Sequence, residues 1–174
     1  MKTTRVKGAA FLVSLSTLSM GCIAPIDDSV AEEEELGDRE LGASTAYCAS
    51  HWNDAPAEFW TTLANASEYM TIVPNWWGYK GSGQAKCMSK IACYESGWAV
   101  HGMNGDYRGM YQIDVDYFPI GECSYSEYWN GGKDIHGMSR LARFWQHYAA
   151  FRYILGRYGS PCAGWSHEVN YGWW

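Results

Sequence analysis

The chain has 174 residues, of which 47% are apolar and 18% are charged. This length suits one domain with a proper core and hardly two, and the composition excludes an intrinsically disordered chain. Aromatic residues make up 16% of the chain and include ten tryptophans. Such a surplus is typical either of a heavily aromatic core or of an exposed groove in which sugar rings stack on aromatic faces.

Residues 1–21 have the pattern of an export signal. The basic residues Lys2, Arg5 and Lys7 precede the run GAAFLVSLSTLSM, which is apolar and ends in small residues. The run is too short and too rich in serine and threonine for a lasting membrane span. We therefore expect residues 1–21 to direct the chain out of the cytoplasm.

The sequence SMGC at 19–22 resembles the end of a bacterial lipoprotein signal. That resemblance implies a lipidated Cys22, membrane anchoring and a periplasmic or cell-envelope location. The family pattern has a leucine three residues before the cysteine, whereas Leu18 stands four before it. The same residues also suit ordinary signal peptidase, which would release a secreted protein, so both outcomes stay open.

Residues 22–43 are predicted to be an acidic flexible linker. The stretch 26–42 contains eight acidic residues and a single basic residue, Arg39. Like charges in a segment with few apolar residues repel one another and keep the segment solvated. The whole chain has a formal charge of -6, so the part after the linker is close to neutral. A near-neutral domain argues against nucleic acid as a partner.

Five cysteines follow Cys22. They are Cys48, Cys87, Cys93, Cys123 and Cys162. Since an exported chain meets oxidising conditions, we expect most of them to form disulfides. Cys87 and Cys93 lie on one predicted helix, about 9 Å apart along its axis, which is too far for them to bridge each other. The connectivity is otherwise open.

Residues 44–174 are predicted to form a mainly α domain with a minor β element. Helical spacing of apolar residues predicts helices over 55–70, 84–94 and 133–158, with loops over 73–83 and 121–132. A β-hairpin or small antiparallel sheet is expected over 98–113, because Asn104-Gly105 is a dipeptide that two-residue hairpin turns prefer. Ser160 as a cap and Pro161 in the first turn predict a last short helix.

Glu95 is the strongest candidate for a catalytic residue. It follows Ile91 by four residues, on the apolar face of its helix, and precedes a glycine that can end the helix. Partial burial, the negative end of the helix dipole and aromatic neighbours all disfavour its charged form, so we expect a raised pKa. A carboxylic acid that keeps its proton near neutral pH can protonate a leaving sugar oxygen.

Three motifs in register carry a family resemblance. They are Glu-Ser-Gly at 95–97, a short hairpin ending in GMYQI at 109–113, and YILGRYGSPCAGWSHEVNYGW at 153–173. Together they resemble the lysozyme-like superfamily of soluble lytic transglycosylases and goose-type lysozymes. The hairpin and the last motif look still more like transglycosylase-like domains of phage tail proteins and actinobacterial secreted proteins. The resemblance spans roughly residues 86–174 and implies an α+β lysozyme-like fold, with helices around a catalytic helix.

The resemblance also assigns roles to individual residues. Glu95 would be the general acid and then the base of the second step. The other residues would bind substrate: Gln112 and the main chain around Met110 at the N-acetyl group, Gly109 where a sugar approaches the backbone, and Tyr111, Tyr153 and His167. Soluble transglycosylases place a tyrosine of an Ala-Tyr-Asn sequence against the acid, whereas this chain has Trp-Ser-His at 165–167. His167 as the partner of Glu95 therefore competes with a merely structural histidine.

A second carboxylate and a metal site were also considered. A hydrolase needs two carboxylates, and Asp106 and Asp114 are the candidates, although either can be a turn or strand-end residue. Lytic transglycosylases need only one, because the N-acetyl oxygen of the substrate stabilises the cationic centre and its 6-hydroxyl attacks. The sequence contains no His-Glu-x-x-His motif and no paired C-x-x-C spacing, so we expect neither a metal nor a cofactor.

Two classes of function remain open. The first is an enzyme, a lytic transglycosylase or a lysozyme-like hydrolase, that cuts the β-1,4 MurNAc–GlcNAc bond of peptidoglycan. The second is a non-catalytic module that binds glycan on the same fold. Glu95 with its apolar helix face favours the enzyme. The expected partners are peptidoglycan strands, and we expect a monomer.

Overall fold

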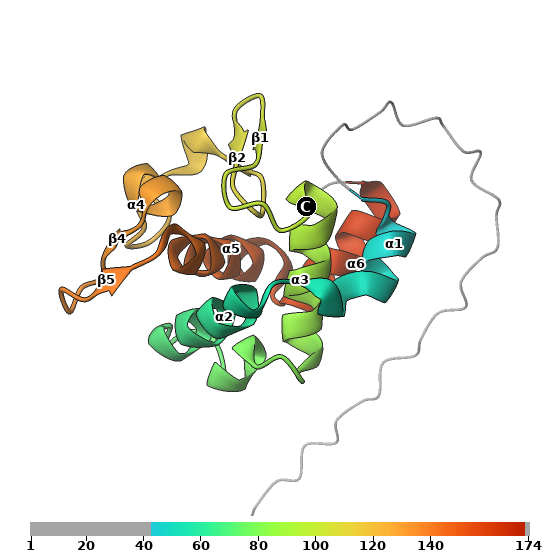
Figure 1. Ribbon diagram of the computed structural model, residues 1–174, viewed down its shortest axis with the longest axis horizontal. Coiled ribbons are helices and arrows are strands. Elements are labelled where there is room, and N and C mark those ends of the chain that lie inside the picture. Colours follow the sequence, from blue (N-terminus) through green and yellow to red (C-terminus); the bar gives the residue numbers. More distant parts are fainter. Residues whose placement is uncertain (1–42, 173–174) are drawn as a thin grey trace, which may run out of the picture. The chain divides into compact units, whose positions relative to one another are not determined.

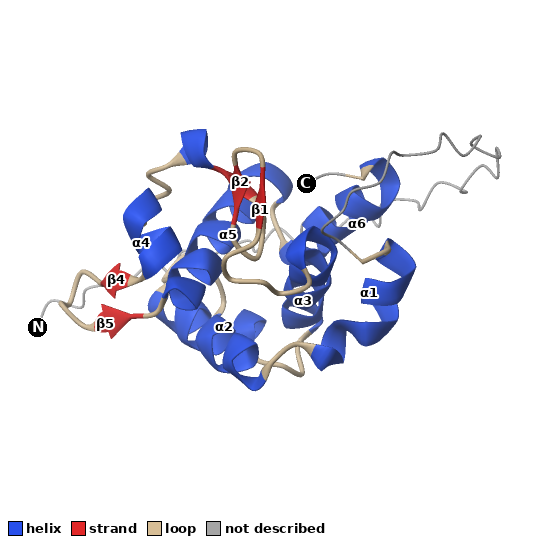
Figure 2. Cartoon of the chain, turned by 45° about the horizontal axis from the view of Figure 1, so that its top comes forward, coloured by secondary structure: helices blue, strands red, loops and turns tan. Residues whose placement is uncertain are grey.

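The structure is a computed structural model that describes residues 43–172 (Figures 1 and 2). The predicted export signal, Cys22, the linker up to residue 42 and the last two tryptophans lie outside the described residues. The helices are α1 (Thr45–His51), α2 (Ala57–Tyr69), α3 (Gly83–Ser96), α4 (Tyr125–Asn130), α5 (Ala142–Tyr158) and α6 (Pro161–Tyr171), with 3-10 turns η1 (Trp52–Asp54), η2 (Asn75–Gly78) and η3 (Val115–Tyr117). The strands are β1 (Met103–Asn104), β2 (Tyr107–Arg108), β3 (Ile113–Asp114), β4 (Gly132–Lys133) and β5 (Ser139–Arg140). The prediction of a mainly α domain with a small antiparallel sheet is confirmed.

The helices pack against one another around the core. α5 packs against α2, α4 and α6, and α3 packs against α6 and α1. The side chains of Phe59, Leu63, Ile91, Phe151 and Ile154, which come from α2, α3 and α5, are fully buried between them. Burial of apolar side chains of this size supplies most of the free energy of folding.

α3 begins and ends where its sequence predicts. Ser82 caps the first turn, because its hydroxyl accepts a hydrogen bond from the Ala85 amide at 2.9 Å. Gly97 ends the helix in the left-handed conformation, with φ of 62°. Trp98 also has a positive φ, 64°, and its indole N–H folds back to donate to the Ser89 carbonyl at 3.1 Å. This stop fixes the direction in which the chain leaves the helix.

The predicted hairpin forms, but its turn lies one residue further along the chain. Asn104 pairs with Tyr107, so Gly105 and Asp106 make the turn. Gly105 has φ of 59°, which suits glycine at the first central position of a tight hairpin turn. β3 pairs with β2 and completes a three-stranded antiparallel sheet. Residues 109–112, which fall in the range predicted as β, form a turn that leads into β3.

Two predictions for residues 121–158 were wrong. The expected loop over 121–132 contains α4, which begins with a capping box between Ser124 and Glu127. The long helix expected from 133 begins only at Ala142, because β4 and β5 pair as a second hairpin. Asp134 holds this hairpin with a 2.9 Å ion pair to Arg140.

Two disulfides cross-link the helices. They join Cys48 to Cys93 and Cys87 to Cys162, so Cys87 and Cys93 do not bridge each other, as predicted. Cys123 is a buried free thiol. Two disulfides are consistent with an oxidising, exported environment. Among the described residues, no helix has the length and apolar content needed to cross a bilayer.

Candidate functional site

Glu95 lies in the last turn of α3 and is half-buried. The same helix buries Met88, Ile91 and Ala92 completely, so the carboxylate continues an apolar face. Tyr128 of α4 lies within electrostatic reach of Glu95. Burial raises the pKa of the Tyr128 hydroxyl well above its usual value, and the negative charge of Glu95 adds to the rise. The charge of Glu95 is therefore felt at α4.

Gln146 of α5 connects the elements around Glu95. Its side chain is fully buried. Its Oε1 accepts a hydrogen bond from the Met110 amide at 2.9 Å, and its Nε2 donates to the Val100 and Tyr128 carbonyls at 2.8 and 3.1 Å. One side chain therefore holds both ends of the 98–112 segment and α4 in place. Gln146 was not predicted as a site residue, and its position within an apolar helix face was the only signal in the sequence.

The end of α3 is also bonded directly to the turn at 109–112. The Ser96 hydroxyl donates to the Met110 carbonyl at 3.0 Å. Gln112 has a positive φ of 47°, which is rare for a residue other than glycine. Its Nε2 donates to the Gly109 carbonyl at 2.7 Å. Together with Trp98, it places a strained backbone position at each end of the hairpin segment beside Glu95, and such positions concentrate at functional sites.

The structure gives Gly109, Met110 and Tyr111 roles inside the fold. A Cβ on Gly109 would lie 2.6 Å from the Tyr128 hydroxyl oxygen, so the close approach to this glycine comes from the protein's own side chain and not from a sugar. Met110 and Tyr111 have fully buried side chains. The Tyr111 hydroxyl is 2.7 Å from Nδ1 of His147. The side chains of Met110 and Tyr111 therefore support the turn from inside the fold.

Three of the predicted site residues line one small pocket. Gln112, Asp114 and Tyr153 surround it together with Ile113, Tyr107 and Tyr117, and its volume is about 30 Å³. A cavity of this volume can hold about one water molecule. The Tyr153 hydroxyl accepts a 2.6 Å hydrogen bond from Arg157. Burial, as the largest cause, raises the pKa of Tyr153.

Neither candidate for a second carboxylate has the setting of a catalytic acid. Asp106 is an exposed residue of the hairpin turn. Asp114 caps η3, since its Oδ1 accepts from the Asp116 amide at 2.9 Å. Both residues therefore have the turn and strand-end roles that were the alternatives at the outset.

His167 lies on α6 between two tyrosine rings. Its ring centroid is 4.9 Å from that of Tyr158 and 4.6 Å from that of Tyr171. The next residue, Glu168, is fully buried, and its charge contributes to a raised pKa of Tyr158, of which burial is the first cause. Glu168 was not predicted as a site residue, since His167-Glu168 lacks a second histidine at metal spacing. The available signal was its spacing from Pro161, Gly164 and Trp165, which are the other buried residues of α6.

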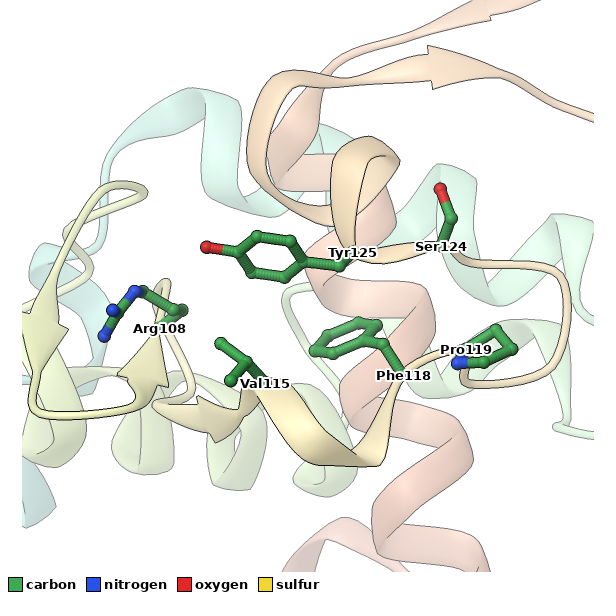
Figure 3. Close-up of a pocket in the computed structure, with 6 residues that line it drawn as sticks. All are labelled: Arg108, Val115, Phe118, Pro119, Ser124 and Tyr125. Carbon is green, nitrogen blue, oxygen red and sulfur yellow. The ribbon is translucent and has the colours of Figure 1, made fainter.

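A larger pocket lies between β2, η3 and the start of α4 (Figure 3). Its volume is about 570 Å³, and it is lined by Arg108, Val115, Phe118, Pro119, Ser124 and Tyr125. This volume is in the range of pockets that hold small ligands. The Phe118 and Tyr125 rings, 5.7 Å apart, form an aromatic wall, and Arg108 adds a positive charge at the rim. Such walls suit the C–H faces of sugars.

Among residues 43–172, no group of histidine, cysteine, aspartate and glutamate side chains is arranged to hold a metal ion. The chain matches no protein-family model, and no curated protein and no solved structure matches it.

Proposed function

We propose that the domain cleaves the β-1,4 MurNAc–GlcNAc bond of peptidoglycan with Glu95 as its single general acid and base, on a lysozyme-like fold. One observation carries this proposal: Glu95 is half-buried at the carboxyl end of α3, where its charge acts on Tyr128 and the adjacent Ser96 bonds the 109–112 turn. Burial and the helix dipole favour the protonated acid at such a place. Protonation of the bridging oxygen is the step that a sugar leaving group requires.

The setting of the aspartates favours a lytic transglycosylase over a hydrolase. Asp106 is in an exposed turn and Asp114 caps η3, so neither is preorganised as a nucleophile or a base. A transglycosylase needs no second carboxylate, since the substrate supplies its own N-acetyl oxygen and 6-hydroxyl. The alternatives are a hydrolase of the same bond and a module that binds glycan without cleaving it.

The products of peptidoglycan digestion test the proposal. We expect mass spectrometry to find anhydro-muramyl ends after incubation with the protein. Reducing ends would indicate a hydrolase, and an intact but bound polymer would indicate a binding module. Glu95→Gln keeps the shape of the side chain but cannot donate the proton, so cleavage should fall about 10²–10⁴-fold. Glu58→Gln, at an exposed position of α2, is the matched control and should cleave normally.

We also propose that the protein is a lipoprotein anchored through Cys22. Four of the five described cysteines are paired, and the fifth, Cys123, is fully buried. The described domain therefore leaves Cys22 without an accessible disulfide partner. Membrane fractionation of Cys22→Ser should move the protein into the soluble exported fraction. A wild-type protein that is soluble, with an unmodified Cys22 or Ile23 at its start, would contradict the anchor.

A further inference from the structure

α3 and α6 lie side by side and run in the same direction (Figure 1). At their starts, Cys162 is disulfide-bonded to Cys87, and its amide donates to Oε1 of Gln84 at 3.1 Å. Further along both helices, a Cβ on Gly164 would lie 3.7 Å from Cδ1 of Ile91. Residues further along α3 therefore contact residues further along α6, as in a parallel helix pair.

This register brings two glutamates to the same end of the interface. Glu95 is one turn after Ile91, and Glu168 is one turn after Gly164. Residues four apart occupy the same face of a helix, and each turn advances both helices by about 5.4 Å. Because Gly164 faces Ile91, the next turn of α6 faces the turn of α3 that carries Glu95.

Glu168 is a charged residue in a position that normally holds an apolar one. Glu168 is fully buried, and no part of it reaches solvent. The charge of Glu168 contributes to the raised pKa of Tyr158 on α5, after burial as the first cause. The Cδ2 atom of Tyr158 also lies 3.4 Å from a Cβ built on Gly164. Glu168 therefore points into the space between α3, α5 and α6 and not away from them. A buried carboxyl is costly to ionise, and more so beside a second one.

We propose that Glu168 is a positioning residue for Glu95, and that the two carboxyl groups share one proton across the α3–α6 interface. Two carboxylates at close range cannot both ionise easily, so the pair retains a proton to a higher pH than either group would alone. The catalytic consequence rests on the proposed function: the shared proton keeps Glu95 able to protonate the leaving oxygen near neutral pH. The proton moves only between the two carboxyl groups, so no further donor is needed.

Several other titratable or charged groups lie on the helices that pack around the pair. They are Lys90 and Tyr94 on α3, Tyr128 on α4, Tyr153, Arg157 and Tyr158 on α5, and His167 on α6. The tyrosines are neutral near pH 7, and Lys90 lies over the Trp165 ring at 5.8 Å. Lys90 and Arg157 are the cations in this set, and His167 is the group that the control variant removes.

The carboxyl carbon signal of Glu95 in NMR tests the pair directly and needs no substrate. It is assigned by its loss in Glu95→Gln. In the wild type we expect this signal to titrate in two steps, with the upper step above the ordinary range of glutamate. Glu168→Gln should leave one step and move it down by about one pH unit or more. The alkaline limb of the cleavage profile should move down by the same amount.

His167→Gln is the matched control on the same helix. It should leave both steps in place, whereas Glu168→Met, which removes the charge with an apolar side chain of similar length, should act like Glu168→Gln. A single ordinary step for Glu95 in the wild type would overturn the pair, and so would an unchanged titration in Glu168→Gln. If the titration behaves as expected but no peptidoglycan is cleaved, the pair stands and the proposed function fails.

Discussion

Gly109 was predicted to be a special position, and the structure shows a reason for its glycine inside the fold. The motif suggested a glycine that lets a sugar approach the backbone. In the structure, Gly109 has φ of 75° and is covered by Tyr128 and Gln146 of the same chain. Glycine is required both for the backbone conformation and for the space.

A pair of glycine variants separates these two requirements. Gly105 also has a positive φ, but no atom lies within 4 Å of a Cβ built on it. Gly105→Ala should therefore cost only the conformational term, about 1 kcal/mol of unfolding free energy. Gly109→Ala should cost about 2–4 kcal/mol, because a methyl group 2.6 Å from the Tyr128 oxygen must also displace that side chain. Urea unfolding measures both values. If both variants lost the same unfolding free energy, the side chains around Gly109 would accommodate a methyl group without a further cost in stability.

Gln112 can be tested for a role in catalysis with two substitutions that differ in backbone strain. Both Gln112→Ala and Gln112→Gly remove the hydrogen bond to the Gly109 carbonyl. Glycine accepts the observed φ of 47°, so we expect it to be more stable than alanine by about 1 kcal/mol. If Gln112 holds the N-acetyl group, both variants should lose about 1–3 kcal/mol of transition-state stabilisation in kcat/KM. Unchanged turnover in both would leave Gln112 with a purely structural role.

Residues whose place at a helix end depends on near neighbours in the sequence were predicted correctly. Glu95 and Ser160 were predicted from their helix ends, because caps and helical faces depend on neighbours within four residues. Tyr128 and Gln146 were not predicted. Gln146 bonds the Met110 amide across 36 residues of sequence, and only the packing of α5 against the sheet brings the two together. Glu168 was missed because a buried glutamate contradicts the usual preference of the core.

At the scale of elements, apolar periodicity located α2, α3 and α5 but misplaced where α5 begins. Lys133 was included in the helix, whereas the chain forms the β4–β5 hairpin first. Asp134 accounts for the difference, since its carboxylate accepts from the His136 and Met138 amides at 2.9 and 3.0 Å and pairs with Arg140. An aspartate that bonds its own following amides favours a turn over a helix. α4 was missed although Ser124 and Glu127 have the spacing of a capping box.

The Cys87–Cys162 disulfide should contribute strongly to the pairing of α3 with α6. It closes a separation of 75 residues, and Cys48–Cys93 closes one of 45. The double variant Cys87→Ser with Cys162→Ser should lose about 3–4 kcal/mol of unfolding free energy, mainly because the unfolded chain gains freedom. Chemical denaturation measures the loss. Cys48→Ser with Cys93→Ser is the comparison, and it should lose a similar amount because the cost depends only weakly on loop length. A loss well under 1 kcal/mol in either variant would contradict this reasoning.

At the scale of the whole molecule, one buried histidine links stability to pH. His147 of α5 is fully buried between the Tyr111 hydroxyl and the Phe59 ring, whose centroid is 4.7 Å away. Burial above all, and then the positive charge of Arg143, lowers the pKa of His147 from 6.5 to about 3. His147 is therefore neutral in the folded protein through the whole range in which a free histidine gains its proton.

The sign of the pH dependence follows from this difference. Below pH 6.5 the unfolded chain binds a proton at His147 that the folded chain does not bind until about pH 3, so stability falls as the pH falls through this window. Between pH 7 and pH 5 the contribution of His147 should be roughly 2 kcal/mol. His147→Gln keeps a polar group beside Tyr111 but cannot titrate. Between pH 7 and pH 5, its unfolding free energy should therefore fall by roughly 2 kcal/mol less than that of the wild type. His101→Gln, at an exposed position, should keep the wild-type dependence. Urea unfolding at a series of pH values measures the unfolding free energy of each protein. If the wild type and His147→Gln lose the same unfolding free energy as the pH falls, His147 is not the group that makes the fold sensitive to acid.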